Sequence, residues 1–281
     1  MAPVVAIIAQ GSMGSGVAAR LVGHGLTVLT SLAGRSAASA KRAKAAGMRA
    51  VGDAEVAGAD MLLSIVPPGE ALPLARRFAP LLRETARKPL YADCNAVSPK
   101  TAREIADVIA ATGAAFVDAG IIGGPPKAAG KGPAFYASGP EARRLAALRD
   151  FGLDVPVLEA PIGAASALKM SYAGITKGLT ALGSVMLLAA TRGGAAAALQ
   201  SELAQSQPAL LAWLTRQVPG MYPKAYRWVA EMQEIAEFVG DDSAARQIFE
   251  GAAELYQRLA ADVAGPKSEI DALSAFLVPK P

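Results

Sequence analysis

The feature that most constrains this chain is a short apolar run followed at once by a glycine-rich turn. Val4 to Ala9 has the length and composition of a buried parallel strand. A glycine turn follows over residues 11–16, an amphipathic helix begins with residues 17–22, and Val28-Leu29 supplies a second strand. Elements in this order place a pyrophosphate on backbone N–H groups at a helix N-terminus. The contacts predicted in the turn are Gly11, Ser12, Met13 and Gly14.

The glycine fingerprint departs from its usual form at one position. Aligned as G-x-G-x-x-G, its second and third glycines are Gly11 and Gly14, and its first position is Ala9. Alanine is the mildest replacement for the glycine of a tight turn. A purely structural turn is the alternative interpretation, but the flanking strand and helix favour a binding unit.

The end of the second strand lacks the acid that usually bonds the ribose 2′-OH of NAD. The first 52 residues contain no Asp or Glu. An arginine fork suits a 2′-phosphate, and small hydroxyl groups donate to the same oxygens. We therefore predict NADP(H) as the cofactor, held by Thr30, Ser31, Arg35 and Ser36. The cations that follow are interpreted as a solvated helix face: Lys41, Arg42 and Lys44.

Length predicts two domains, and the charge pattern argues against nucleic acid as a partner. The 281 residues and 52% hydrophobic content are enough for sizeable cores. The net charge of +4 comes from 28 basic and 24 acidic residues dispersed along the chain, and aromatic residues are few. This pattern argues against nucleic acid as a partner. It is compatible with a small-molecule substrate, including an anionic one.

Individual residues and segments indicate the cell compartment and exclude some classes of site. The only cysteine, Cys94, excludes an internal disulfide and fits a reducing cytoplasm. No cationic region precedes the first apolar run, so we interpret that run as a strand and not as a signal peptide. The apolar stretch between Lys177 and Arg192 is shorter than the roughly 20 residues that span a bilayer, so no membrane partner is expected. His24, the only histidine, argues against a His-based metal site or a Ser-His-Asp triad, and its position favours helix capping.

The first half of the chain alternates strands with helices, and the second half is helical. Further strands are predicted at residues 61–66, 90–92, 116–118, 134–137 and 155–158, and helices at residues 72–82 and 99–111, the latter capped by Ser98. Ligands of such sheets gather at the carboxyl ends of strands, which adds Val66, Pro67, Pro68 and Asn95 to the predicted cofactor site. The predicted fold is α/β plus all-α. A Rossmann-like, doubly wound sheet occupies residues 1–162, and a helical substrate and dimerisation domain occupies residues 163–281.

Four motifs in order along the chain resemble those of the β-hydroxyacid dehydrogenase superfamily, which includes 6-phosphogluconate dehydrogenase and 3-hydroxyisobutyrate dehydrogenase. They lie at residues 11–14, 93–99, 118–124 and 163–170. The resemblance implies cofactor contacts in the first two motifs and a substrate loop in the third, with Ile122, Gly123 and Gly124. It also implies that Lys169, in the fourth, is the catalytic lysine. Residues 222–232 resemble a less characterised branch with a shorter, distinct helical domain.

The chain departs from the family's pattern at positions that would contact substrate. Ala173 replaces a substrate-binding asparagine, Tyr172 an Asn or His, Thr176 an acid, and Ile122 a serine. The resemblance therefore leaves the substrate open and argues against decarboxylation assisted by a second general acid. Tyr172 and Thr176 stay candidate substrate contacts, with Tyr172 either a second proton donor or a packing residue.

These observations predict an NADP-dependent dehydrogenase or reductase acting on a small hydroxy acid or its carbonyl partner, with Lys169 as general acid or base. An NADPH-dependent imine reductase is the alternative enzyme, which Ala173 and Ile122 favour and Lys169 disfavours. A non-catalytic NADP sensor is the alternative from another class. Lys177 is interpreted as a surface lysine. The resemblance also implies a homodimer through residues 164–190 and the C-terminal helices.

Overall fold

The computed structural model describes residues 2–126, 130 and 132–278, and it divides into two compact units. Unit 1 comprises residues 1–170 and unit 2 comprises residues 171–281. The predicted domain boundary, between residues 162 and 163, precedes a long helix. The contact pattern divides the chain inside that helix, after Met170.

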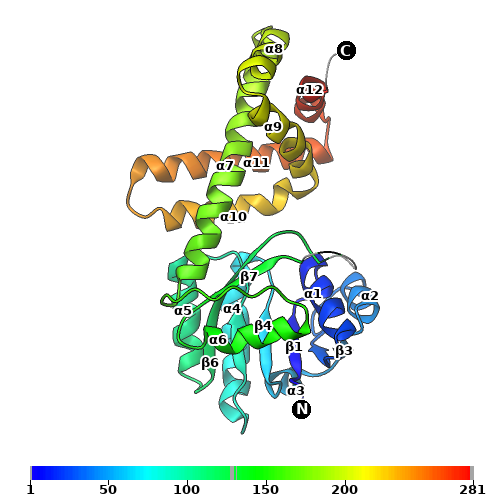
Figure 1. Ribbon diagram of the computed structural model, residues 1–281, viewed down its shortest axis with the longest axis vertical. Helices are drawn as coiled ribbons and strands as arrows, with labels where there is room; N and C mark the ends of the chain where they lie inside the picture. The colour runs from blue at the N-terminus through cyan, green and yellow to red at the C-terminus, as the bar shows by residue number, and fades with distance from the viewer. Residues whose placement is uncertain (1, 127–129, 131, 279–281) are drawn as a thin grey trace. The chain divides into compact units, whose positions relative to one another are not determined.

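Within the described residues, unit 1 is built on a seven-stranded sheet with the order β3-β2-β1-β4-β5-β6-β7 (Figure 1). All pairings are parallel except that of β6 with β7. The order reverses beside β1, which opens a crevice at the carboxyl ends of β1 and β4. The strands are β1 (Val5–Ile8), β2 (Val28–Thr30), β3 (Arg49–Ala50), β4 (Met61–Ser64), β5 (Leu90–Asp93), β6 (Ala115–Ile122) and β7 (Ala134–Ser138).

Helices cover both faces of this sheet and enclose two apolar cores. One core lies under α1 and α2, and the other lies under α4 and α5. The helix predicted to follow Ser98 is confirmed, since its hydroxyl accepts from Thr101 N at 3.2 Å and Pro99 is the first helical residue. The helices are α1 (Ser12–Gly23), α2 (Ala37–Ala45), α3 (Asp53–Ala57), α4 (Pro68–Glu84), α5 (Pro99–Ala110), α6 (Ala142–Leu145) and the 3-10 helix η1 (Ala146–Phe151).

The strand predicted at residues 155–158 is wrong. This segment bonds to β7 only locally, through Ala137 N to Pro156 O at 2.9 Å and Leu158 N to Ala137 O at 2.8 Å. Pro156 has no N–H group, so a regular ladder cannot continue along the segment. Strand β3 was not predicted, because two residues are too few to display a period of two.

Among its described residues, unit 2 contains helices joined by turns and no strand, as the sequence predicts. Helix α7 begins in unit 1 and continues into unit 2, and α10 and α11 pack against one another. The helices are α7 (Ala164–Arg192), α8 (Ala196–Ser206), α9 (Pro208–Met221), the 3-10 helix η2 (Tyr222–Lys224), α10 (Ala225–Phe238), α11 (Ser243–Ala264) and α12 (Ser268–Leu277).

Lys177 is not the surface lysine that the sequence suggested. Its ammonium group forms an ion pair with Glu231, and each side chain is only 14% exposed. The same ammonium lies 4.9 Å from the centre of the Trp228 ring, and the Tyr256 hydroxyl donates to the Lys177 carbonyl. Lys177 therefore joins α7 to α10 and α11, and its charge is neutralised inside unit 2.

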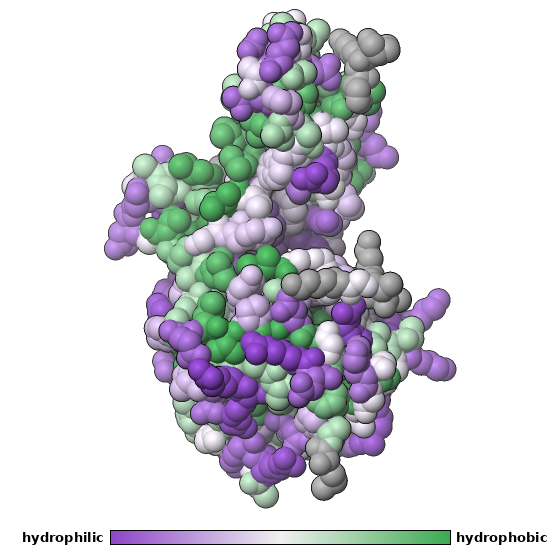
Figure 2. Space-filling view, in the orientation of Figure 1, coloured by the Kyte–Doolittle hydropathy of each residue, from purple (hydrophilic) through white to green (hydrophobic). Residues whose placement is uncertain are grey.

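One face of α7 in unit 2 exposes a row of large apolar side chains, which we call the α7 stripe. Figure 2 shows hydrophobic residues gathered along this helix. The stripe recurs at alternating intervals of three and four residues and consists of Tyr172, Ile175, Leu179, Leu182 and Met186, between 45% and 64% exposed. Spacing of this kind is typical of a helix that packs against another helix.

Helix α7 also meets two criteria for a membrane span. Among the described helices it is the one whose length and composition are sufficient, with 29 residues and an 18-residue window of mean hydropathy 1.4, of which 39% is buried. The apolar stretch predicted between Lys177 and Arg192 was shorter because the helix extends further towards the N-terminus. Core helices of soluble proteins meet the same criteria, so the finding is weak evidence for a membrane.

Candidate functional site

The glycine turn leaves the first turn of α1 open to a ligand. Gly11 is the N-cap residue, and among the described residues no side chain caps α1 and no acid lies in its first turn. A Cβ on Gly14 would lie 1.9 Å from the carbonyl oxygen of Ala9, so only glycine allows this close approach. A Cβ on Gly11 would meet nothing within 4 Å. Open space beside uncapped N–H groups fits a pyrophosphate.

The hydroxyl of Thr30 is engaged inside the sheet. It donates to Ile7 O at 2.7 Å and accepts from the side-chain amide of Gln10, which also donates to Ser31 O at 2.8 Å. Gln10 and Thr30 are fully buried. No sequence motif marks Gln10, yet its side chain bonds the end of β2 from the position just before the glycine turn. The Ser31 hydroxyl accepts from Ala33 N at 3.4 Å.

Two arginines lie beyond the end of β2. Arg35 is half-buried and lines a cavity of about 90 Å³ together with Val66, Glu70 and Arg77, so the structure brings Arg35 close to the loop that follows β4. Arg42 is more than part of a solvated face, because its Nε donates to Gln10 O at 2.7 Å.

Ser36, predicted as a cofactor contact, is also the N-cap of α2. Its hydroxyl accepts from Ser39 N at 3.3 Å. The interpretation of Lys41 and Lys44 as exposed side chains is confirmed.

Asn95 holds the ends of β4 and β5 together. Its Oδ1 accepts from Val66 N at 2.6 Å, and its Nδ2 donates to Ser64 Oγ at 2.8 Å and to Asp93 Oδ1. The side chain is buried, and these contacts use its amide within the protein. Asn95 therefore positions the loop with Val66 and Pro67, which leads into α4 at Pro68.

A row of polar residues crosses the sheet near the carboxyl ends of its strands. Ser64, Asp93, Asp118 and Ser138 are neighbours in register on β4, β5, β6 and β7, and all are buried. Asp93 Oδ2 has no hydrogen-bond partner among the described residues. Burial raises the pKa of Asp93 to about 7, the Asn95 hydrogen bond opposes the shift, and the nearby charge of Asp118 adds to it.

Lys169 lies over β6. It is half-buried on the second turn of α7, and its Cβ is 3.1 Å from the position that a Cβ on Gly120 would take. Gly120 belongs to β6, two residues after Asp118. The predicted catalytic lysine and the carboxyl edge of the sheet therefore meet within unit 1.

The predicted substrate contacts fall in both units. In unit 1, Ile122 ends β6 half-buried, and Gly123 and Gly124 are exposed. The φ of Gly123 is 126°, and a Cβ there would lie 3.0 Å from Pro133, so this position requires glycine. In unit 2, Tyr172 is 51% exposed, and the hydroxyl of Thr176 donates to Tyr172 O at 2.8 Å.

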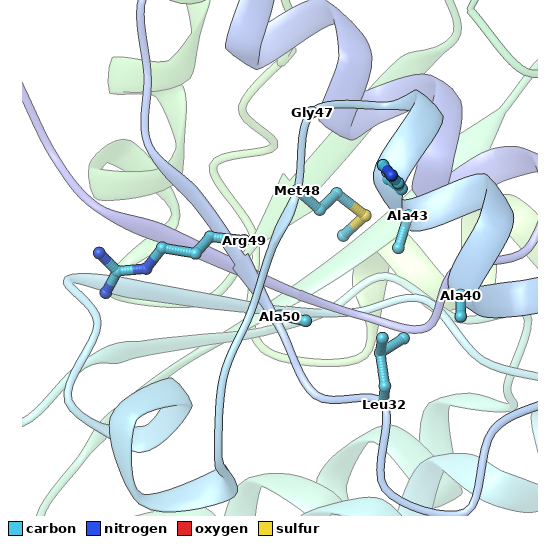
Figure 3. Close-up of a pocket in the computed structure, with 8 residues that line it drawn as sticks. Leu32, Ala40, Ala43, Gly47, Met48, Arg49 and Ala50 are labelled. Atoms are coloured by element: carbon cyan, nitrogen blue, oxygen red, sulfur yellow. The ribbon is translucent and has the colours of Figure 1, made fainter.

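A larger cavity of about 530 Å³ lies between α2 and β3 (Figure 3). Its lining is mostly apolar, with Met48 facing Ala43 and the Arg49 side chain extending away from them. It shares no lining residue with the predicted cofactor and substrate site. We therefore assign the candidate site to the crevice at the carboxyl ends of the strands.

Comparison with protein families divides the chain in two. Residues 4–151 match the family described as the NAD binding domain of 6-phosphogluconate dehydrogenase. Residues 190–259 match a domain of unknown function, DUF1932. The glycine turn, Asn95 and Asp118 fall within the first match, whereas Lys169 lies between the two.

Two relatives match part of the chain at the sequence level. An uncharacterised 28.5 kDa protein of Methanothermus fervidus is 33% identical over 157 residues, which are 55% of this chain and 58% of the relative. The 3-hydroxyisobutyrate dehydrogenase of Pseudomonas aeruginosa is 33% identical over 102 residues, which are 35% of this chain and 34% of the relative. The chain thus spans 58% and 34% of the lengths of these relatives.

Solved structures share the fold over nearly the whole chain. A conserved protein of unknown function, described as structurally similar to 3-hydroxyacid dehydrogenases, has 28% identity and a TM-score of 0.69, covering 91% of this chain and 99% of the other. The 3-hydroxyisobutyrate dehydrogenase of Mycobacterium tuberculosis has 22% identity and a TM-score of 0.70, with 99% and 98% covered. An imine reductase of Myxococcus stipitatus in complex with NADP+ has 19% identity and a TM-score of 0.55, with 99% and 100% covered.

The buried carboxyl of Asp93 predicts a pH dependence of stability. Its folded pKa of about 7 exceeds the ordinary value of 3.8, so between these values the folded state keeps a proton that the unfolded state has lost. Stability should therefore fall as pH rises through this window, by about a few kcal/mol. Asp93→Asn should remove this component, measured as the urea-unfolding free energy at about pH 5 and pH 8.

Asp107→Asn is the matched control, because Asp107 is exposed on α5. It should show the same decline as the parent protein. An equal decline in Asp93→Asn and the parent would contradict the assignment.

Proposed function

Because the chain belongs to the family of the NAD binding domain of 6-phosphogluconate dehydrogenase, we propose that it is an NADP-dependent oxidoreductase of the β-hydroxyacid dehydrogenase type. It transfers hydride between NADP(H) and a small hydroxy acid or its carbonyl partner. The observation that carries the proposal is the position of Lys169 over Gly120, at the carboxyl edge of the sheet that bears the uncapped glycine turn.

The proposed cofactor site consists of backbone N–H groups in the glycine turn and of Arg35 beyond the end of β2. The N–H groups of Ser12, Met13 and Gly14 bind the pyrophosphate, and Val66 and the two prolines after it line the crevice. When bound, the cofactor supplies or accepts the hydride. Asn95 serves this site by holding the N–H of Val66.

Arg35 selects NADP(H) over NAD(H) in this proposal. Arg35 lines a cavity with Val66 of the loop after β4, and no acid lies at the end of β2 to bond a ribose 2′-OH. A guanidinium pairs with a 2′-phosphate through charge-assisted hydrogen bonds. Ser31 and Ser36 add hydroxyl groups, and Thr30 supports them through the sheet.

We expect NADPH to bind at least about tenfold more tightly than NADH, a difference of about 1.4 kcal/mol. Arg35→Ala should remove most of this preference, because the pairing to the 2′-phosphate is lost. Lys44→Ala, on the exposed face of α2, is the control and should keep it. Fluorescence titrations at fixed ionic strength measure both affinities, and equal affinities in the parent protein would overturn the assignment.

Lys169 exchanges the proton in this reaction. As hydride reaches the carbon of a carbonyl substrate, the ammonium donates to the oxygen, and the neutral amine accepts that proton in the reverse direction. The side chain is half-buried over β6, next to the Gly120 position.

Lys169→Met should lower kcat by roughly 10²–10⁴ and leave NADPH affinity near the parent value, because proton transfer belongs to the transition state. A panel of hydroxy acids and aldehydes, followed at the nicotinamide absorbance, supplies the substrate and the rates. Lys224→Met removes an exposed lysine and is the control. Lys177 is unsuitable because its ion pair supports unit 2.

Imine reduction is the second candidate, and the apolar positions favour it. Ala173 is buried and Ile122 is apolar, where the resembled family carries polar substrate contacts. Tyr172, exposed on α7, would then be the proton donor. Full turnover of a hydroxy acid by Lys169→Met would refute the lysine mechanism, and turnover of imines with loss in Tyr172→Phe would favour the second candidate. An absence of turnover with all three substrate classes would favour an NADP sensor.

We propose a homodimer whose contact includes the α7 stripe. Its apolar side chains recur with the intervals of a helix–helix seam, and burial of such side chains stabilises association. A second copy of this chain offers the same stripe, which suits a two-fold interface.

Leu182→Glu should convert the dimer to a monomer at micromolar concentration, because the interface would bury an unpaired charge. Ala110→Glu is the control, since Ala110 is exposed at the end of α5 in unit 1, outside the residues of the proposed interface, and its replacement should leave the dimer intact. Light scattering coupled to size-exclusion chromatography measures the mass. A monomeric parent protein would contradict the proposal.

A further inference from the structure

The carboxylate of Asp118 is bonded to the start of α7. It is fully buried on β6, and it accepts from Gly163 N at 2.9 Å, Ser166 N at 3.1 Å and Ser166 Oγ at 2.6 Å. It also accepts from Ser138 Oγ at 2.9 Å. A buried carboxylate is stable without a cation only when donors of this kind surround it.

Ser138, on β7, extends the same contact. Its hydroxyl donates to Asp118 and accepts from Ala165 N at 3.0 Å. The first N–H groups of a helix have no partner inside the helix. Here the N–H groups of Gly163, Ala165 and Ser166 find theirs on two strands of the sheet, so the first turn of α7 is attached to β6 and β7 from outside the helix.

Gly120 provides the space for this attachment. Residues two apart on a strand share a face, so Gly120 and Asp118 both face α7. A Cβ on Gly120 would lie 2.7 Å from Ala165 O and 3.1 Å from Lys169 Cβ. Strand β6 thus contacts α7 at two positions. Asp118 accepts hydrogen bonds from the first turn of the helix, and Gly120 packs closely against the turn that carries Lys169.

We propose that Asp118, acting through Ser138 and Ser166, is a positioning residue that sets the location of Lys169, with Gly120 as the close-contact position. This inference rests on the proposed function of Lys169. A misplacement of about 1 Å far from the reacting atoms can cost roughly 10² in rate, because reacting groups must meet at the correct distance. The serine–carboxylate contact is therefore part of what makes Lys169 effective.

Kinetics test the positioning role. Ser166→Ala should lower kcat about tenfold, and Gly120→Ala should lower it more, because its Cβ must displace the Ala165 carbonyl. NADPH affinity should not change. Each kcat is calculated per NADPH-binding site, so that unfolded protein does not lower its value. Gly251→Ala, an exposed position on α11 where a Cβ meets nothing within 4 Å, is the control and should keep the parent kcat.

A double-mutant cycle separates positioning from general destabilisation. In the Lys169→Met background, Ser166→Ala should cause no further loss of kcat, because it acts through the lysine. A merely structural role would lower kcat by the same factor in both backgrounds, and that result would overturn the proposal. Unchanged kcat in both Ser166→Ala and Gly120→Ala would also overturn the proposal.

Hydrogen exchange tests the attachment without any substrate. Asp118→Asn and Ser138→Ala should speed exchange of the amides of residues 163–166 by at least about tenfold, with β1 unchanged as the internal reference. If Asp118→Asn does not fold, Ser138→Ala decides this arm. Unchanged exchange in the variants would overturn the attachment. If the variants exchange faster but the parent protein reduces no substrate, only the proposed function is refuted.

Discussion

The hydrogen bonds that the Asp118 carboxylate accepts are the interaction on which the rest of the site depends. A charged group with no exposed surface is costly, and here the cost is offset by donors from Ser138, Ser166 and the backbone of α7. The carboxylate therefore cannot form its contacts unless the helix begins at one place on the sheet. Strand β6 supplies this constraint, and Lys169 follows one helical turn after Ser166.

Asp93 and Asp118 are adjacent in register but have opposite environments. Asp118 is surrounded by donors, whereas Asp93 has one buried oxygen without a partner among the described residues. Burial raises the pKa of Asp93 to about 7, and the hydrogen bond from Asn95 opposes the shift. Two residues of the same type on neighbouring strands thus differ in their contacts, since Asp118 bonds to the start of α7 and Asp93 accepts from Asn95.

Most departures from the resembled pattern lie outside the family match. The matched residues 4–151 contain the glycine turn and the loops around Asn95, where backbone geometry leaves little freedom. Three of the four departures from the resembled pattern follow Lys169 on α7, outside that match and before the region matched by the domain of unknown function: Tyr172, Ala173 and Thr176. The fourth, Ile122, lies inside the match. The family match therefore ends before α7 begins and does not extend to the residues that follow Lys169.

The sequence by itself determined the features that depend on neighbours along the chain. The sequence predicts every described strand except β3, together with the glycine turn, the cap at Ser98 and the change to helices after residue 163, because each follows from residues within a few positions of one another. Its one false strand is residues 155–158, which form only isolated bridges. The same holds for the missing acid after β2.

Only the tertiary structure decided which side chains meet across long separations. Asp118 bonds to Ser166, 48 residues later, and Lys177 pairs with Glu231, so neither contact leaves a local pattern. Thr30 and Asn95 were correctly placed at strand ends, but their side chains are engaged inside the protein. A sequence records the donors and acceptors that a chain carries. Folding decides which of them are brought together, because buried polar groups must find partners wherever the packing places them.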